Sequence, residues 1–562
     1  MADGDGRDGY DRYDRPAAYN QRAGYDEPGY DDQAGYDYRT QYADDPRYRR
    51  SGGRRNGRGG SSWWRRRSRL AKVGYIAASV VTVLAVVAGA TGYAIYRRLD
   101  GNITVLKVHG LSGKTVYGAL NILVLGSQER QGQKGHFGKE ADPWTTNSDN
   151  LLLIHLDPTH THATVLSIPR DTMVYEPGCQ ARIPQIGIGT QGPYTYPPGS
   201  IIDGALNIGG PACAVSTVED LTGIKLDHFV EFDFNSFRTM VDTLGGVEVC
   251  VPPGPGYHDQ ASGVNLRPGK HLLKYNQALA YVRTRHDLGG ADAGGDLPRI
   301  ELQQAFISSV IQQVNATGLL GNVPRLLSIA DTATKALTVD SGLGTVSSLL
   351  TLARSLAHLK SRNVSLITMP TATDTFDSPT YSARLVTVQP ADDVLFNMIR
   401  TGQPWTGHLP TEPARDLQVR VLNATGEPGL AARTAAKLRR LGFHVTGVGN
   451  APPTSTTTVE YAGLVQSDGA YTLMAGLKSV PAGENTLAEP TPQVGRPGPV
   501  TLVLGTNFAG VKLPAPAVAA HAAGTSKKAG RRRAGAGQPG SAGTVQSRNA
   551  AANICSGLPS AN

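Results

Sequence analysis

The stretch NLLLIHLDPTHTHATVLSIP, residues 150–169, contains two apolar runs separated by a short polar turn. The first run ends at Asp157 and the second at Pro169, and a third run, NILVLG (residues 121–126), lies upstream. Short apolar runs that end at Gly, Asp or Pro are typical of β-strands buried on both faces. The stretch therefore predicts a sheet that is covered on both sides.

Strand and helix patterns alternate downstream of this stretch. They are HFVEFDF (228–234) and GGVEVCVP (245–252) for strands, and residues 299–315, 344–358 and 392–400 for helices. Strands interleaved with helices predict a layered α/β domain, about residues 115–400. A proline-bearing linker, residues 401–415, follows this domain.

A second, smaller α/β domain is predicted over residues 416–510. LQVRVLNATG is typical of a strand that enters a turn, and GLAARTAAKLRRLG of a helix that ends at Gly442. FHVTGVGN and PVTLVLG add further strands. The segment contains no obvious set of acid, base and nucleophile, so it offers no candidate catalytic residue.

Both ends of the chain are predicted to be disordered. Residues 1–69 consist largely of Gly, Asp, Arg and Tyr with few aliphatic side chains, and residues 511–562 are mostly Ala, Gly, Ser and Pro. Neither end offers enough apolar surface to offset the entropy that is lost on ordering.

Residues 73–96 form an uncharged run of 24 residues, which predicts a transmembrane helix. At about 1.5 Å per residue, such a helix spans the ~30 Å hydrocarbon core of a bilayer. A long segment precedes it, so we expect an uncleaved anchor and not a signal peptide. Eleven Lys or Arg lie between Arg47 and Lys72, against three soon after the helix. The positive-inside rule therefore places the N-terminus in the cytoplasm and the main domains outside.

The net charge of +9 could indicate a nucleic acid partner, but the excess lies beside the apolar run and in the C-terminal tail. Arginines next to a membrane need only anionic lipid as a partner. No nucleic-acid-binding motif is present, so we expect no nucleic acid partner. Transcriptional attenuation through the basic N-terminal tail is an alternative without a motif to support it.

The four cysteines, Cys179, Cys213, Cys250 and Cys555, all fall on the predicted outer side, where disulfides persist. Four cysteines allow three pairings, and their spacing does not suit a zinc site. We expect a disulfide between Cys179 and Cys213, which flank a Gly/Pro-rich loop, with Cys250 as the competing partner.

Residues 278–304, ALAYVRTRHDLGGADAGGDLPRIELQQ, place Arg283, Arg285 and Arg299 around a glycine-rich loop. Arg283 and Arg285 can converge only where a helix gives way to an extended segment, because residues two apart on a helix point in different directions. Guanidinium forks bind phosphate oxygens two at a time, so three of them around one point suit a diphosphate.

Asp296 and Pro298 predict a helix start beyond the loop. This start puts Arg299 in the first turn and Gln303 one turn later on the same face. A helix N-terminus beside an arginine favours an anion. The alternative is that the arginines pair with carboxylates on a wet surface, namely Asp287, Asp292 or Glu301.

Two further groups lie at strand ends, where loops of α/β sheets commonly hold ligands. Asp149 stands at the entrance of one strand, and Arg170 and Asp171 follow the end of another. A carboxylate beside arginines is suited to a hard divalent cation that shares the phosphate charge. Asp149 as a turn cap, and Arg170 with Asp171 as a surface pair, are the alternatives.

Five motifs in order resemble the LytR-CpsA-Psr (LCP) family of cell-wall polymer ligases. Over residues 118–315 they are NILVLGSQER, SDNLLLIHLDP, LSIPRDTMV, MVDTLGGVEVCVP and ALAYVRTRHDL…DLPRIELQQ. The segment VRVLNATGEPGLAARTAAKLRRLGFHV, with VTLVLGTNF, is similar to the LytR C-terminal domain.

The resemblance implies an α-β-α domain with a mixed central sheet, outside the cell membrane. It implies a transferase that moves a glycopolymer from a polyprenyl diphosphate carrier to peptidoglycan as a phosphodiester, with Mg²⁺ or Mn²⁺ as cofactor. It implies Asp149 as metal ligand and, as diphosphate contacts, Arg130, Arg170, Arg283, Arg285, Arg299 and Gln303. The catalytic set it implies is Asp149, Arg170, Arg283 and Arg285, with Asp171 as a candidate base.

One departure concerns the metal, because Gln128 stands where the family usually has Asp. It supports an alternative in which the chain holds a polyprenyl phosphate or the wall as a regulatory protein, without turnover. The identity of the polymer also stays open, with teichoic or teichuronic acid, arabinogalactan and capsule as possibilities.

Overall fold

The computed structural model describes residues 69–108, 110–113, 118–127, 148–174, 179–180, 193–194, 201–286, 288, 296–316, 323–356, 359–373, 384–478, 498–512 and 545–559. The chain divides into two compact units, Met1–Val83 and Leu84–Asn562, and the boundary falls inside the first described helix. The units are described separately below.

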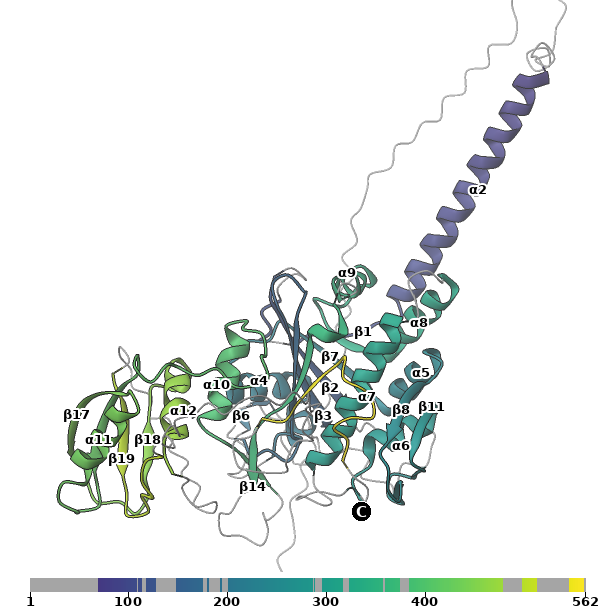
Figure 1. The fold of residues 1–562 in the computed structure, drawn as a ribbon. Coiled ribbons are helices and arrows are strands. Elements are labelled where there is room, and N and C mark those ends of the chain that lie inside the picture. Colours follow the sequence, from purple (N-terminus) through teal and green to yellow (C-terminus); the bar gives the residue numbers. More distant parts are fainter. Residues whose placement is uncertain are drawn as a thin grey trace, which may run out of the picture. The chain divides into compact units, whose positions relative to one another are not determined.

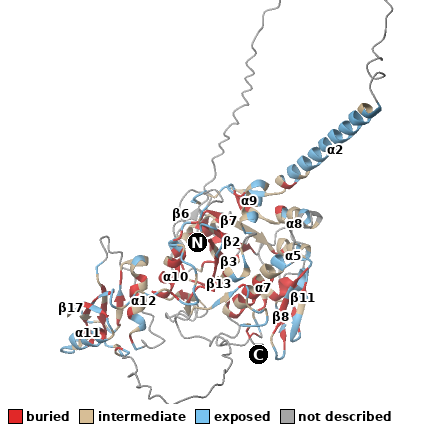
Figure 2. Cartoon of the chain, turned by 45° about the horizontal axis from the view of Figure 1, so that its top comes forward, coloured by how far each residue is buried: buried red, intermediate tan, exposed pale blue. Residues whose placement is uncertain are grey.

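Helix α2 (Arg69–Asp100) is long and apolar enough to cross a membrane, with a mean hydropathy of 2.2 over its most apolar window. It is the one such helix in the described part of the chain. Its valines, leucines and tyrosines are exposed along most of its length (Figure 2). The expected apolar helix over residues 73–96 is confirmed, and it extends by about one turn at each end.

The core of the second unit is an eight-stranded sheet with the order β1-β12-β7-β2-β3-β4-β13-β20 (Figure 1). Its strands are β1 (Thr104–Leu106), β2 (Leu120–Ser127), β3 (Ser148–Leu156), β4 (Ala163–Ile168), β7 (His228–Asp233), β12 (Thr338–Asp340), β13 (Val364–Thr368) and β20 (Ser547–Asn549). β3 runs antiparallel to both β2 and β4, whereas β7 is parallel to β2 and β13 is parallel to β4. The sheet is therefore mixed, as expected.

Helices cover both faces of this sheet. They are α3 (Gly204–Gly209), α4 (Pro211–Thr222), α5 (Phe234–Thr243), α6 (Tyr275–Arg283), α7 (Asp296–Ala316), α8 (Val323–Ala336), α9 (Val346–Leu356) and α10 (Ala391–Arg400). Leu151 and Leu153 of β3 join the core formed with α4 and α10, and Leu152 between them joins the core on the face of α7 and α9. Figure 1 shows α4 and α10 on one side of the central strands and α7 on the other. The predicted α-β-α layering is confirmed.

Smaller elements complete this part of the chain. Hairpins form between β8 (Val247–Val251) and β11 (Gly269–Leu273), β9 (Tyr257–Asp259) and β10 (Val264–Leu266), and β14 (Thr371–Thr373) and β15 (Leu385–Thr387). The two-residue strands β5 (Cys179–Gln180) and β6 (Pro193–Tyr194) also pair. The first two hairpins pack with α6 and α7 around a separate apolar cluster that includes Tyr257 and Tyr281.

The C-terminal α/β domain has a four-stranded sheet with the order β17-β16-β19-β18. Its elements are β16 (Gln418–Asn423), α11 (Leu430–Arg440), β17 (His444–Asn450), β18 (Thr458–Glu460), α12 (Ser467–Ala475) and β19 (Val500–Leu504). α11 buries Ala431, Ala435 and Leu438 against the strands. The strand–helix–strand pattern expected from the sequence is present.

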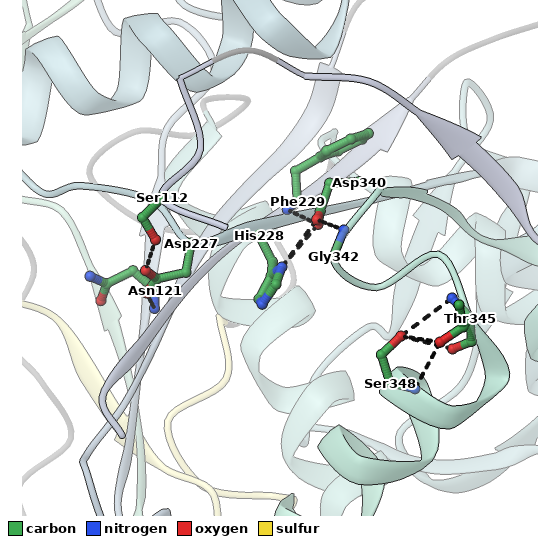
Figure 3. A network of polar contacts seen from close by, with 9 residues as sticks. All are labelled: Ser112, Asn121, Asp227, His228, Phe229, Asp340, Gly342, Thr345 and Ser348. Atoms are coloured by element: carbon green, nitrogen blue, oxygen red, sulfur yellow. Dashed lines mark hydrogen bonds and ion pairs between the residues drawn. The ribbon is translucent and has the colours of Figure 1, made fainter. Parts of the chain in front are cut away.

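A buried polar network ties β7 to the turn after β12 (Figure 3). The Asp340 carboxylate accepts hydrogen bonds from the backbone N–H groups of Phe229 (3.1 Å) and Gly342 (2.7 Å), and its Oδ1 lies 3.1 Å from His228 Nδ1. His228 and Asp340 are both buried. These contacts satisfy the Asp340 carboxylate and His228 Nδ1 inside the core, which favours a structural role for this Asp–His pair.

The C-terminal tail was expected to be disordered from residue 511, and this expectation is wrong for residues 545–559. β20 extends the main sheet by pairing antiparallel with β13, with Ser365 opposite Asn549. Farther along, Tyr257 Oη donates a 2.7 Å hydrogen bond to the carbonyl oxygen of Pro559. An edge strand offers unpaired backbone groups to any extended segment, so a segment with little apolar surface can still order there.

Cysteines anchor the same tail. Cys250 of β8 forms a disulfide with Cys555, 305 residues away in the sequence, so Cys250 is not the partner of Cys179. Cys213 is also disulfide-bonded. The side chain of Cys179 lies outside the described residues, and the expected Cys179–Cys213 pairing stays a prediction.

Replacing Cys555 by serine is expected to lower the free energy of unfolding by about 2–4 kcal/mol, because the cross-link restricts the unfolded chain. Urea unfolding of the full-length protein in detergent measures the change. Cys250→Ser should cost the same amount, and the double variant should cost no more than either single one. Peptide mapping without reductant that found free thiols at Cys250 and Cys555 would refute the pairing.

Candidate functional site

A pocket of about 220 Å³ opens where the end of β4, the entrance of β3, the β9–β10 turn, the C-terminus of α6 and the N-terminus of α7 meet. Its lining is mostly polar and charged. The lining residues are Asp149, Arg170, Asp259, Ala261, Ser262, Val282, Arg283, Arg285, His286, Arg299 and Gln303.

The antiparallel pairing of β3 and β4 places Asp149 next to Arg170. Leu151 lies opposite Ile168 in the register, so the start of one strand meets the end of the other. Arg170 Nη1 donates a 2.8 Å hydrogen bond to Asp149 Oδ1. The two motifs that the sequence placed at separate strand ends therefore form one charged wall.

The geometry of the chain after α6 brings Arg283 and Arg285 to the same pocket. α6 ends at Arg283, and Thr284 has extended backbone angles of φ −61° and ψ 130°. Residues on either side of an extended residue share a side of the chain. The guanidinium of Arg283 lies over the ring of Phe234, 4.8 Å from its centroid, which holds this side chain by a cation–π contact.

α7 begins at Asp296, as the sequence predicted, and its first turns reach the pocket. Arg299 lies in the first turn, and Gln303 one turn later donates a 3.1 Å hydrogen bond from Nε2 to the carbonyl oxygen of Val282. This bond links the end of α6 to the start of α7. Both side chains line the pocket.

One buried carboxylate joins three of the arginines. Asp296 Oδ1 lies 2.6 Å from Arg299 Nη2, 3.3 Å from Arg285 Nη2 and 3.7 Å from Arg170 Nε. The side chains of Asp296 and Arg299 are only 3% and 5% exposed. Asp296 therefore balances part of the positive charge and holds the three guanidinium groups around one point.

The alternative interpretation paired the arginines with Asp287, Asp292 or Glu301 on a wet surface. Glu301 was one of the expected partners. Burial raises the pKa of its carboxyl group to about 7, and the charge that opposes this rise is that of Arg548, which is not one of the pocket arginines. Asp287 and Asp292 lie outside the described residues. The carboxylate that Arg170, Arg285 and Arg299 share is Asp296, and its side chain is buried.

The local charges shift several ionisation equilibria. Burial lowers the pKa of Arg299 to about 10, with Arg285 and Arg170 adding repulsion against the attraction of Asp296, so Arg299 stays charged near neutral pH. Burial raises the pKa of Asp203 to about 6. Arg299 Nε is buried and has no hydrogen-bond partner among the described residues.

Asp259 and His286 also line the pocket. Asp259, at the end of β9, is buried, and His286 follows Arg285 with a side chain that is 63% exposed. His286 Nδ1 lies 3.2 Å from Asp259 Oδ1. This pair was not predicted from the sequence, although His286 stands inside the quoted arginine motif. Asp259 lies far upstream of that motif, and nothing in its spacing indicated that it would meet the arginines.

The expected site residues fall into three groups. The structure brings six of them to the pocket, namely Asp149, Arg170, Arg283, Arg285, Arg299 and Gln303. Asp171 does not line the pocket, and its Oδ1 lies 3.5 Å from Arg170 Nε. Arg130 and Gln128 lie outside the described residues. Asp296 was expected only as a helix start. Its contacts with three arginines were not predicted from the sequence.

The donor set limits how a metal could bind. The described residues contain no group of three or more His, Cys, Asp or Glu side chains that could hold a metal ion. Of the two carboxylates that line the pocket, Asp259 accepts hydrogen bonds from three backbone N–H groups, which leaves Asp149 as the candidate ligand. Mg²⁺ commonly uses one or two carboxylates and completes its shell with water and substrate phosphates. The described donors therefore fit a cation shared with a phosphate substrate, and they do not fit a site made of protein ligands alone.

The fold and the pocket define a layered α/β domain with a pocket that is lined by four arginines. The LytR_cpsA_psr family matches residues 90–389, and the family described as LytR cell envelope-related transcriptional attenuator matches residues 416–508. The chain belongs to the LytR-CpsA-Psr family.

Named relatives extend this finding. The chain is 29% identical over 409 residues to the cell wall biosynthesis protein LcpA of Corynebacterium glutamicum, covering 66% of this chain and 75% of that protein. It is 28% identical over 268 residues to the polyisoprenyl-teichoic acid–peptidoglycan teichoic acid transferase TagV of Bacillus subtilis. This match covers 45% of this chain and 60% of TagV. Among solved structures, a LytR-Csp2A-Psr enzyme from Actinomyces oris superposes with a TM-score of 0.39 at 22% identity, covering 54% of this chain and 96% of that one.

Changing Arg285 to lysine keeps the charge but removes the planar fork, so transfer of a diphosphate-linked substrate should fall by on the order of 10². Arg283→Lys should have a similar effect and also loses its fit over Phe234. Initial rates with purified full-length variants measure both. Arg267→Lys, an exposed change outside the pocket lining, is the matched control. Wild-type rates in both pocket variants would show that Arg283 and Arg285 are not the phosphate contacts.

Proposed function

We propose that this chain is a membrane-anchored transferase that moves a glycopolymer from a polyprenyl diphosphate carrier to a hydroxyl group of peptidoglycan. The observation that carries the proposal is the gathering of Arg170, Arg285 and Arg299 on Asp296 at the wall of one pocket. Family membership supports the reaction class, and relatives such as TagV are named as transferases of this kind.

The arginines suit this reaction because both products of the P–O bond cleavage carry charge. The acceptor oxygen bonds to the phosphorus next to the glycan, and the polyprenyl monophosphate leaves with the bonding electron pair. Preorganised guanidinium groups stabilise charge that develops on the transferred phosphoryl and on the leaving phosphate. Arg299 is buried and held by Asp296, so little reorganisation is needed when the charge develops.

Mg²⁺ or Mn²⁺ is the proposed cofactor, held by Asp149 together with substrate phosphate oxygens. When bound, a divalent cation neutralises phosphate charge. Arg170 binds Asp149 directly and so fixes the direction of this carboxylate at the pocket wall.

The proposed location is the cell membrane, with helix α2 as a single span. The eleven basic residues that precede or begin this helix favour a cytoplasmic N-terminus beside anionic lipid, and the two α/β domains then lie outside. Cysteines that are paired in the structure suit that oxidising side.

The decisive experiment incubates full-length protein in detergent with polyprenyl diphosphate-linked glycans and peptidoglycan, and detects the phosphodiester-linked product by mass spectrometry. Lipid-linked teichoic, teichuronic, arabinogalactan and capsular precursors form the parallel arms. Product in any arm supports the transferase. Tight binding of every lipid precursor without product would support the non-catalytic alternative.

A further inference from the structure

The pair His286–Asp259 lines the same pocket as the arginines. His286 Nδ1 lies 3.2 Å from Asp259 Oδ1. No hydrogen bond to His286 Nε2 occurs among the described residues, and 63% of the side chain is exposed. One imidazole nitrogen is therefore held by a carboxylate while the other is open to a ligand.

Asp259 is fixed as an ionised partner. Its carboxylate accepts hydrogen bonds from the backbone N–H groups of Ala261 (2.9 Å), Arg285 (2.9 Å) and His286 (3.2 Å). Burial alone would raise the pKa of Asp259, but these hydrogen bonds outweigh it and lower the pKa below its usual value. An ionised carboxylate on Nδ1 favours the tautomer with its proton there, which leaves the Nε2 lone pair free.

The other Asp–His pairs in the described part of the chain do not line the arginine pocket. His228 and Asp340 are buried inside the sheet and form the network of Figure 3. His162 lies 3.8 Å from Asp157 beside the turn between β3 and β4, and it does not line the arginine pocket. His286 is the one imidazole among the residues that line this pocket.

We propose that His286 is the general base that takes the proton of the acceptor hydroxyl, and that Asp259 is the residue that positions it. The inference rests on the proposed function. As the acceptor oxygen bonds to phosphorus, its proton passes to His286 Nε2 and the P–O bond to the polyprenyl phosphate breaks. The polyprenyl phosphate leaves with the electron pair, and the imidazolium is stabilised by Asp259.

The acidic groups near the arginines are less suited to this task. Asp149 is engaged with Arg170 Nη1, and Asp296 is buried among three arginines. Asp171, the base expected from the sequence, and Asp203 do not line the pocket. The bonds from Asp259 to the backbone of Arg285 and His286 also couple the base to the phosphate-binding arginines in one rigid turn.

The test measures transfer by full-length wild type, His286→Gln and His286→Ala as a function of pH. Removal of a general base should lower kcat by on the order of 10² while KM for the lipid-linked donor changes by less than roughly threefold. The acid limb of the wild-type pH–rate profile should vanish in His286→Gln. Added imidazole should restore part of the rate of His286→Ala. The other charged groups that face the pocket are present in all variants, namely Asp149, Asp259, Arg170, Arg283, Arg285 and Arg299.

His258→Gln is the matched control. His258 is an exposed histidine of β9, the strand that carries Asp259, and it does not line the pocket. It should keep the wild-type rate and pH profile. Wild-type transfer with an unchanged rate and acid limb in His286→Gln would overturn the base assignment alone. Absence of transfer by the wild type with every lipid-linked glycan would overturn the proposed function and the assignment with it.

Discussion

Asp296→Ala is expected to lower polymer transfer by on the order of 10³ and to destabilise the main domain by about 3–5 kcal/mol. Its side chain is only 3% exposed, and its Oδ1 lies near the guanidinium groups of Arg170, Arg285 and Arg299. Without it, three positive groups lose their shared partner inside a partly buried site. They would repel one another and no longer point to one place.

Asp296→Asn separates the two effects. The amide keeps the size of the side chain and one carbonyl oxygen, so the helix start should survive while the charge is lost. We expect this variant to retain more stability than Asp296→Ala but to transfer polymer poorly. Urea unfolding and initial rates measure both quantities. Asp220→Ala, an exposed carboxylate of α4, should change neither. Full activity in a folded Asp296→Ala variant would show that the arginines are positioned by other groups.

The layers of the fold could be predicted from the sequence because their signals are local. The runs at 121–126, 150–157 and 163–169 became β2, β3 and β4, the centre of the sheet. β20 could not be predicted, since its pairing with β13 joins segments far apart in the sequence and depends on backbone groups of an edge strand. The disulfide between Cys250 and Cys555 could not be predicted either, because the two residues are 305 positions apart in the sequence.

The residues of the site also differ in whether they could be predicted from local sequence. Arg283, Arg285 and Arg299 lie in one motif, and the helix–loop–helix geometry that makes them converge follows from that motif. Asp259 comes from a separate hairpin and meets Arg285 through backbone N–H groups, which carry no sequence signal. Local patterns thus identified the arginines that line the pocket, whereas the groups that hold them in place required the three-dimensional structure.

Asp149→Ala is expected to reduce transfer by on the order of 10³ even at saturating metal, because Asp149 is the carboxylate at the pocket wall proposed to hold the cation. The variant also frees Arg170 from its 2.8 Å bond, so the loss has two sources. Asp149→Asn separates them, since the amide oxygen still accepts a hydrogen bond from Arg170 but contributes no charge to a metal. Transfer close to the wild-type rate in both variants would remove this carboxylate from the reaction.

Metal affinity provides a measurement that does not depend on turnover. One carboxylate already bound to an arginine is a weak ligand set, so calorimetric titration of the apo protein with Mg²⁺ or Mn²⁺ should give modest affinity, rising when a polyprenyl diphosphate supplies oxygens. Gln128→Asp adds a negative ligand at the position where the family usually has one, and it should tighten metal binding to the apo protein. Asp149→Asn should weaken binding in both backgrounds. Equal affinity of wild type and Gln128→Asp would mean that residue 128 does not face the metal, and the cation would then depend on Asp149 and the substrate.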